Sequence, residues 1–228
     1  VTLAIWGLGE CWDFDRPAGW ALLLVAGGLG SLAWVRRSAV LLVVVLAAVY
    51  ALLLGSAGAW GGGSAAFAAA LALGVGLVAA VRLRPAGVEY DGVVATLRLF
   101  GWLGFLSCSY LLSFDRLAGA LLDWGEAAVG AREQLIAYRW APFGVAVALW
   151  GRLLMRAERG ESPRVPWEEW LCPIGLLYCN LLGVTGTASG TLFVSLVFNL
   201  ICLGIAAMWM VRGCRDGLLR ETVLGSVL

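Results

Sequence analysis

The sequence contains no histidine, so its carboxylates are the side chains best suited to carry protons or bind ions. Acidic residues buried inside a membrane commonly mark pathways for ions or protons. Here every Asp and Glu is expected in a loop or at the edge of an apolar segment, and no charged residue is expected near the middle of a helix. This pattern argues against ion-coupled transport and against an ion channel.

Several other reactive groups are missing from the sequence. It has no histidine and all 16 basic residues are arginine, so the usual ligand for haem, copper, zinc and chlorophyll is lacking. Without lysine a retinal-type Schiff base is excluded, and no serine has a His or Lys base to activate it. The six cysteines show no CxxC spacing and imply no disulfide framework. We therefore expect no enzyme activity, no cofactor and no metal.

Amides and hydroxyls are the polar groups left inside the apolar segments. They are Ser107, Ser109, Asn180, Ser195 and Asn199. One interpretation is a small polar lining among three helices, which would suit a carrier. The more common role of such side chains in membranes is interhelical hydrogen bonding, worth about 0.6 kcal/mol per contact. The sequence favours this second role.

The elements that hold these residues are predicted to be membrane-spanning helices. With 61% hydrophobic residues, 14% charged residues and a mean hydropathy of +0.89, the chain is too apolar to build a water-soluble surface. A spanning helix needs roughly 20 mostly apolar residues. We predict an all-α, polytopic membrane helix bundle in a single domain covering residues 1–228. Its seven spans lie at about 20–35, 39–54, 65–81, 93–114, 140–155, 167–182 and 191–211.

Arginine placement predicts the orientation of the bundle. Cytoplasmic loops of membrane proteins carry an excess of arginine and lysine. One side of the predicted topology holds Arg36, Arg37, Arg82, Arg84, Arg152, Arg156, Arg159, Arg164, Arg212, Arg215 and Arg220. The opposite side holds only Arg16, Arg116, Arg132 and Arg139, and Arg98 heads the fourth span near the first side. The N-terminus is therefore expected outside and the C-terminus in the cytoplasm.

The sixth predicted span and the external loop at 115–139 contain residues that predict local structure or a possible site. Pro166 is expected near the first helical position, with Glu168 and Glu169 in the positive first turn. Pro173 predicts a kink within that helix. The loop at 115–139 collects several acids, so it is the one region where a membrane enzyme acting on lipid-linked substrates could place a site.

Two stretches carry a resemblance to known sequences. One runs from Leu97-Arg98-Leu99-Phe100-Gly101 to Tyr110-Leu111-Leu112-Ser113-Phe114, and the other joins Asn199 and Gly204 to Arg212-Gly213-Cys214-Arg215. Together they resemble the C-terminal part of a broad family of predicted polytopic bacterial membrane proteins of unknown function. The resemblance implies a helical membrane fold in the inner membrane of a bacterium, and no particular activity.

The leading functional hypothesis is a structural or accessory subunit of a larger membrane protein complex. It depends on the missing intramembrane charges and the missing cofactor ligands. The alternative is a carrier or channel for a small neutral or lipophilic solute, lined by the amides and hydroxyls named above. The expected partners are the lipid bilayer and other membrane subunits. A net charge of +1 gives no case for nucleic-acid binding.

Overall fold

The fold is helical throughout the part of the chain that the structure describes. This computed structural model describes residues 27–33, 35–36, 38–59, 63–83, 92–114, 118, 132–160, 165–185 and 191–217, which contain no strand. The helices are α3 (Ala39–Ala59), α4 (Gly63–Arg82), α5 (Gly92–Leu112), α7 (Arg132–Glu158), the 3₁₀ helix η1 (Trp167–Trp170), α8 (Leu171–Thr185) and α9 (Thr191–Asp216). The predicted all-α class is confirmed for these residues.

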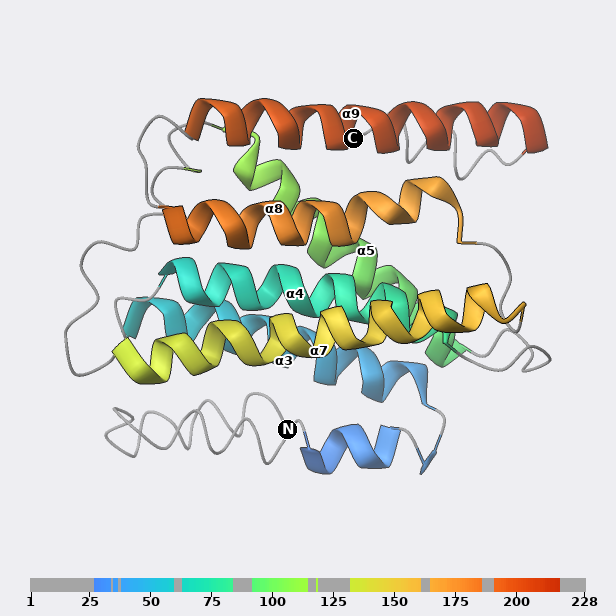
Figure 1. Ribbon diagram of the computed structural model, residues 1–228. Coiled ribbons are helices and arrows are strands. Elements are labelled where there is room, and N and C mark those ends of the chain that lie inside the picture. The colour runs from blue at the N-terminus through green and yellow to red at the C-terminus, as the bar shows by residue number, and fades with distance from the viewer. Residues whose placement is uncertain are drawn as a thin grey trace.

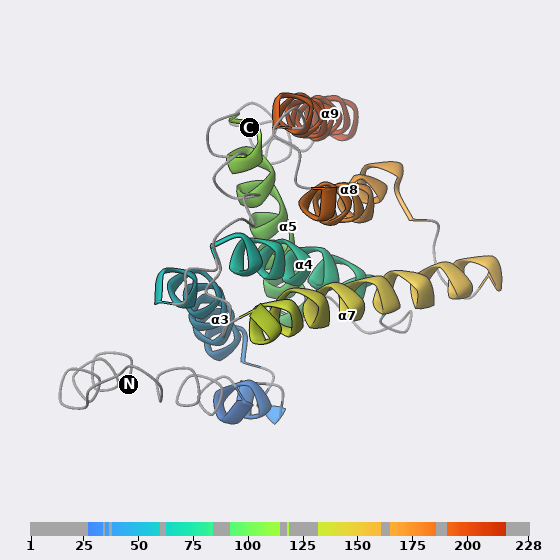
Figure 2. The same ribbon diagram turned by 60° about the vertical axis from the view of Figure 1, so that its left-hand side comes forward.

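The long helices form a bundle in which consecutive helices run in opposite directions (Figure 1). Helix α4 lies in the middle and packs most extensively on α5 and α7, with α3 and α8 also against it. Helix α9 lies on the far side from α3, where it packs on α5 and α8 (Figure 2). The central helix is therefore enclosed by protein, whereas α9 presents one side to the surroundings.

Small side chains explain the central place of α4. Its sequence is rich in alanine and glycine, and small residues let neighbouring helix backbones approach closely. The closest approach is to α5, where a Cβ added to Gly74 would lie 2.8 Å from the Phe105 backbone nitrogen. A Cβ added to Gly101 would lie 3.0 Å from the Val78 backbone nitrogen. These two glycines set the crossing of α4 and α5.

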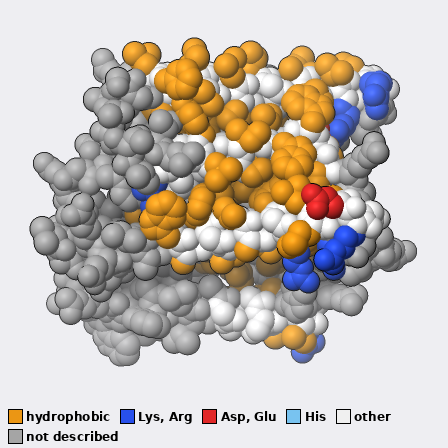
Figure 3. Space-filling model, viewed as in Figure 1, with side chains coloured by type: hydrophobic (Ala, Val, Ile, Leu, Met, Phe, Trp, Pro, Cys, Tyr) orange, Lys and Arg blue, Asp and Glu red, His pale blue; other side chains and the backbone are white. Residues whose placement is uncertain are grey.

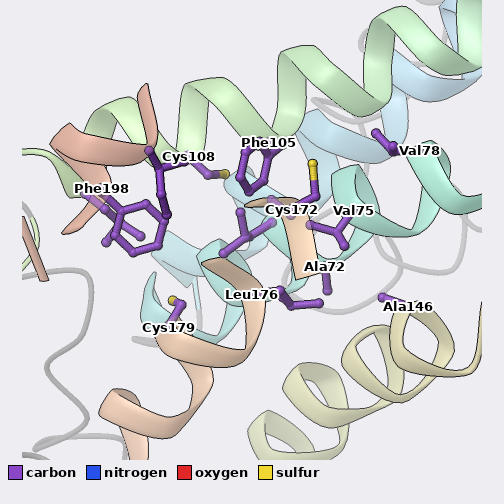
Figure 4. Close-up of a cluster of buried hydrophobic side chains, with 14 of the residues drawn as sticks. Ala72, Val75, Val78, Phe105, Cys108, Ala146, Cys172, Leu176, Cys179 and Phe198 are labelled. Carbon is purple, nitrogen blue, oxygen red and sulfur yellow. The ribbon is translucent and has the colours of Figure 1, made fainter. Parts of the chain in front are cut away.

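Apolar side chains and thiols fill the space between α4, α5, α8 and α9. Figure 4 shows Phe105 and Phe198 beside Leu176, and the thiols of Cys108, Cys172 and Cys179 belong to the same buried cluster. All three cysteines are free thiols. They behave as small hydrophobic residues, which fits the missing disulfide pattern.

Three of the described helices are long and apolar enough to cross a membrane. The qualifying segments are Ala65–Arg82, Gly92–Leu112 and Leu192–Arg215, and a shorter apolar segment covers Ala39–Ala51. They correspond to the second, third, fourth and seventh predicted spans. A count of seven spans and the orientation of the bundle stay predictions. Residues 20–26 of the first predicted span lie outside the described residues.

Helix α7 begins earlier than the sequence predicted. The predicted span started at residue 140, but the helix begins at Arg132, so residues 132–139 are helical and not part of the external loop assigned to 115–139. Hydropathy located the predicted boundary, whereas Arg, Glu, Gln, Leu and Ala are good helix formers whatever their polarity. Apart from Ala118, residues 115–131 lie outside the described residues.

The sixth predicted span, at 167–182, divides into two helices. Trp167–Trp170 forms a 3₁₀ turn and α8 follows from Leu171 to Thr185. Pro173 therefore falls in the first turn of α8, where its missing N–H breaks no hydrogen bond within that helix. The 3₁₀ turn rises more steeply per residue, so η1 and α8 together extend about 30 Å.

Candidate functional site

Two adjacent glutamates in the 3₁₀ turn form the centre of the candidate site. The turn follows Pro166, and both Glu168 and Glu169 are only 2% exposed. A buried carboxylate needs paired positive charges and hydrogen-bond donors to offset its lost hydration. Three arginines from three other helices supply them. We define Glu168, Glu169, Arg82, Arg98 and Arg212 as the arginine–glutamate cluster.

Glu169 is held by the last residue of α4. Arg82 donates from Nε to both carboxylate oxygens, at 3.2 and 2.8 Å, and from Nη2 to Oε1 at 2.6 Å. This two-pronged contact is the strongest geometry for a guanidinium and a carboxylate. Arg98 of α5 adds a second positive charge, with its Nη2 4.0 Å from the same Oε1. Glu169 therefore joins η1 to both α4 and α5.

Glu168 is held by the last helix. Its Oε1 lies 2.5 Å from Nη2 of Arg212, near the C-terminal end of α9. The other oxygen, Oε2, is buried and finds no hydrogen-bond partner among the described residues. One turn deeper, the rings of Trp102 on α5 and Trp209 on α9 meet edge to face at 5.4 Å. Arg98 and Arg212 thus flank the same seam between α5 and α9.

Further arginines lie at this end of the bundle. Arg156 of α7 donates from Nη1 to the backbone carbonyl of Leu83 at 2.6 Å, directly after the end of α4. In Figure 3 most blue side chains gather at the right-hand end, while hydrophobic side chains cover the middle of the face. We name this region the arginine end of the bundle. It gathers arginines that were predicted on the cytoplasmic side.

A second polar contact lies between α7 and α8. Arg139 is 3% exposed, and it donates to the side-chain oxygen and the backbone oxygen of Asn180, both at 2.9 Å. Asn180 in turn donates to the Leu176 carbonyl at 2.9 Å. Arg139 was predicted in the loop at 115–139, but it lies in the first part of α7 and its side chain is buried. Asn180 forms interhelical hydrogen bonds and does not face open space.

The five residues predicted as a polar lining do not gather around one space. Ser107 and Asn199 lie on the exposed surface, and Asn199 donates to the carbonyls of Ser113 and Ser195, both at 2.9 Å. Ser109, Ser195 and Asn180 are buried. Within the described part of the chain, the Ser109 hydroxyl has no hydrogen-bond partner. The amides and hydroxyls are therefore divided between the outer surface and separate helix contacts.

The chemistry available to the cluster is electrostatic. Guanidinium groups stay protonated in proteins and only donate hydrogen bonds, so they cannot act as bases toward the glutamates. Within the described ranges, no three His, Cys, Asp or Glu side chains are grouped closely enough to hold a metal. The cluster can tie helices together and attract anions.

The position of Glu168 and Glu169 at the start of a helix was predicted correctly, but their burial and their partners were not. A usable signal was present, because tryptophans bracket the pair in Trp167-Glu168-Glu169-Trp170. Interfacial tryptophans on both sides indicate that the turn enters the membrane boundary. Arginines near the ends of other helices, such as Arg82 and Arg212, were therefore candidate partners for the two glutamates.

Comparisons with known proteins add no assignment. The chain matches no protein family, no curated protein and no solved structure.

Proposed function

We propose that this chain is an integral membrane subunit with a structural or accessory role in a larger membrane protein complex. The observation that supports this proposal is the use of its buried polar groups. The Arg82–Glu169, Arg212–Glu168 and Arg139–Asn180 contacts each join two helices of the same chain. Trp150 likewise donates from α7 to the Val75 carbonyl of α4 at 3.1 Å. These groups stabilise the bundle, which suits a scaffold better than a catalyst.

The outer surface supports a membrane location. Helix α9 exposes large apolar side chains along its length, including Leu192 at 72%, Leu203 at 66% and Val211 at 63%. Contiguous apolar surface of this extent is unfavourable in water and favourable against lipid or another membrane protein. We place the chain in the inner membrane of a bacterium, with the arginine end in the cytoplasm, because arginine is enriched on that side.

The carrier hypothesis receives less support. It requires amides and hydroxyls from several helices to line one continuous path. Ser107 and Asn199 instead face outward, and Asn180 is engaged by Arg139. We therefore retain the accessory role as the proposed function.

Quantitative mass spectrometry after gentle extraction tests the accessory role. The chain would be expressed at its natural level, extracted from native membranes in a mild detergent, captured by a C-terminal tag and separated by size. We expect other membrane proteins at a fixed molar ratio to this chain, and the same ratio in a second detergent. Recovery as a lone monomer or homo-oligomer would refute the proposal.

A pair of glycine variants provides the matched control for this experiment. A Cβ added at Gly144 would meet no described atom within 4 Å, so Gly144→Ala should keep the partners. Gly74→Leu places a large side chain against the backbone of α5 and should disrupt the bundle. Partners that remain bound to the Gly74→Leu chain would be non-specific contaminants, and would not count as subunits.

A further inference from the structure

The arginine–glutamate cluster places its negative and its positive groups at different depths in the bundle. Arg82 and Arg98 contact the carboxylate of Glu169, and Arg212 contacts that of Glu168. The carboxylates are buried, with side-chain exposures of 2% and 3%, whereas Arg98 and Arg212 are 40% and 32% exposed. The negative charges therefore lie inside the bundle and the positive charges face outward. Such a surface attracts anions.

The depth of the two exposed arginines matches a lipid headgroup. Arg98 lies six residues after Gly92, the first residue of α5, which places it about 9 Å along the helix. Arg212 lies four residues before Asp216, the last residue of α9, or about 6 Å from that end. Long arginine side chains at this depth reach toward the headgroup region from an apolar helix.

Directly beside the arginines, α5 presents an apolar stripe to the surroundings. Leu99 and Leu103 are 52% and 57% exposed, and Tyr110 continues the same helical face at 53%. On the neighbouring helix, Met210 and Val211 are also exposed next to Arg212. An anion bound at the arginines would therefore sit at the top of a surface suited to hydrocarbon chains. This combination distinguishes a phospholipid from a small soluble anion.

We propose that Arg98 and Arg212 bind the phosphate of an anionic phospholipid at the seam between α5 and α9, with its acyl chains along the exposed apolar stripe of α5. A guanidinium has five N–H donors in a planar fork that matches phosphate oxygens. Arg212 gives one short contact to Glu168, and this contact leaves further donors on the same group. The glutamates hold the arginines in position from the inside. Basic sites between helices on the cytoplasmic side commonly hold anionic headgroups.

Arg98→Gln is the variant that tests the site while Glu169 keeps its main partner. Arg82 holds Glu169 through three hydrogen bonds, so Glu169 stays paired when the 4.0 Å contact to Arg98 is lost. The matched control is Arg36→Gln, which removes the same charge from an exposed arginine. The helical segment before α3 lies on the opposite side of the bundle from α9 in both ribbon views (Figures 1 and 2).

The measurement is native mass spectrometry of the purified full chain in micelles that contain equal amounts of phosphatidylglycerol and phosphatidylcholine. We expect the wild-type chain and Arg36→Gln to retain phosphatidylglycerol preferentially, and Arg98→Gln to bind it roughly tenfold more weakly, as expected for the loss of one charge-assisted hydrogen bond. Glu168→Gln/Arg212→Gln, which removes both members of the second ion pair together, should show a similar loss.

Three results would overturn the proposal. Equal retention of the two lipids would show that no anionic headgroup is selected, and unchanged preference in both site variants would place the lipid elsewhere. Thermal stabilisation by inorganic phosphate equal to that by phosphatidylglycerol would identify the ligand as a soluble anion. Circular dichroism and size exclusion of each variant establish that a lost preference is not the result of unfolding.

Discussion

Alanine at Gly74 or Gly101 is expected to force α4 and α5 apart. At Gly74 the added Cβ would lie 2.8 Å from the Phe105 nitrogen and 3.0 Å from the Gly101 oxygen. At Gly101 it would lie 3.0 Å from the Val78 nitrogen and 3.1 Å from the Gly74 oxygen. These atoms belong to the backbone, so a change of rotamer cannot relieve the contacts. The two helices must separate by several tenths of an ångström.

The size of the effect follows from two opposing contributions. Overpacking of a tight core commonly costs about 1–3 kcal/mol. Alanine also favours the helix over glycine by about 1 kcal/mol. We expect a net loss of about 1–2 kcal/mol in the free energy of unfolding for Gly101→Ala. The loss should be larger for Gly74→Ala, because its closest contact is shorter.

Reversible unfolding in mixed micelles measures this free energy, by titration with a denaturing detergent and detection of helix content. Two glycines of α7 provide controls in the same bundle. An added Cβ at Gly144 or Gly151 would meet nothing within 4 Å among the described residues, so their alanine variants should keep their stability or gain up to about 1 kcal/mol.

The reasoning about the crossing is refuted if the alanine variants of Gly74 and Gly101 are as stable as those of Gly144 and Gly151. Equal stability would show that the backbones of α4 and α5 are further apart than the 2.8–3.1 Å contacts require. A loss at all four positions would point instead to a general requirement for flexible helices. Only a loss confined to the crossing supports the structure.

Three further predictions concern the buried polar groups, each measured by thermal or detergent unfolding. Glu169→Gln should lower the free energy of unfolding by about 1–3 kcal/mol because Arg82 loses its charged acceptor. In a double-mutant cycle, Arg82→Gln/Glu169→Gln should lose less stability than the sum of the two single variants, and additive losses would argue against the pair. Asn180→Leu should cost about 1–3 kcal/mol because buried Arg139 loses an acceptor, while Asn199→Leu, on the surface, should cost less than about 1 kcal/mol; similar losses would contradict this difference. Ser109→Ala should leave stability unchanged or raise it by up to about 1 kcal/mol, since the hydroxyl is buried without a partner among the described residues, and a loss above about 1 kcal/mol would contradict this account of the hydroxyl.

Long apolar runs made the positions of most helices predictable from the sequence. A stretch such as residues 65–81 has too few polar side chains for anything except a buried or lipid-facing helix. Helix ends were less predictable, because hydropathy reports the solvent and not the backbone conformation. Residues 132–139 continue as helix α7 in spite of their charges, and α3 extends to Ala59, five residues beyond the predicted end of the second span at residue 54.

The candidate site could be predicted only in part. The types of residues at the helix ends were visible, but pairing depends on which helices become neighbours. Nothing in the sequence links Arg82 to Glu169, which are 87 residues apart, or Arg212 to Glu168. Asn180 was predicted as an interhelical contact residue from its type, whereas its partner Arg139 was assigned to a loop. The sequence does not show which helices lie next to one another, and this arrangement decides which polar side chains pair.

The position of the Trp167–Trp170 turn along the chain has a consequence for synthesis and insertion. Arg82 and Arg98 leave the ribosome well before Glu169, whereas Arg212 leaves after it, so the ion pairs of the turn form in two stages. Until the turn emerges, α4, α5 and α7 must stay together without its carboxylates. A nascent chain halted before Trp167 would therefore lack the ion pairs of the turn, whereas one halted after α8 would already contain both members of the Glu169 pairs.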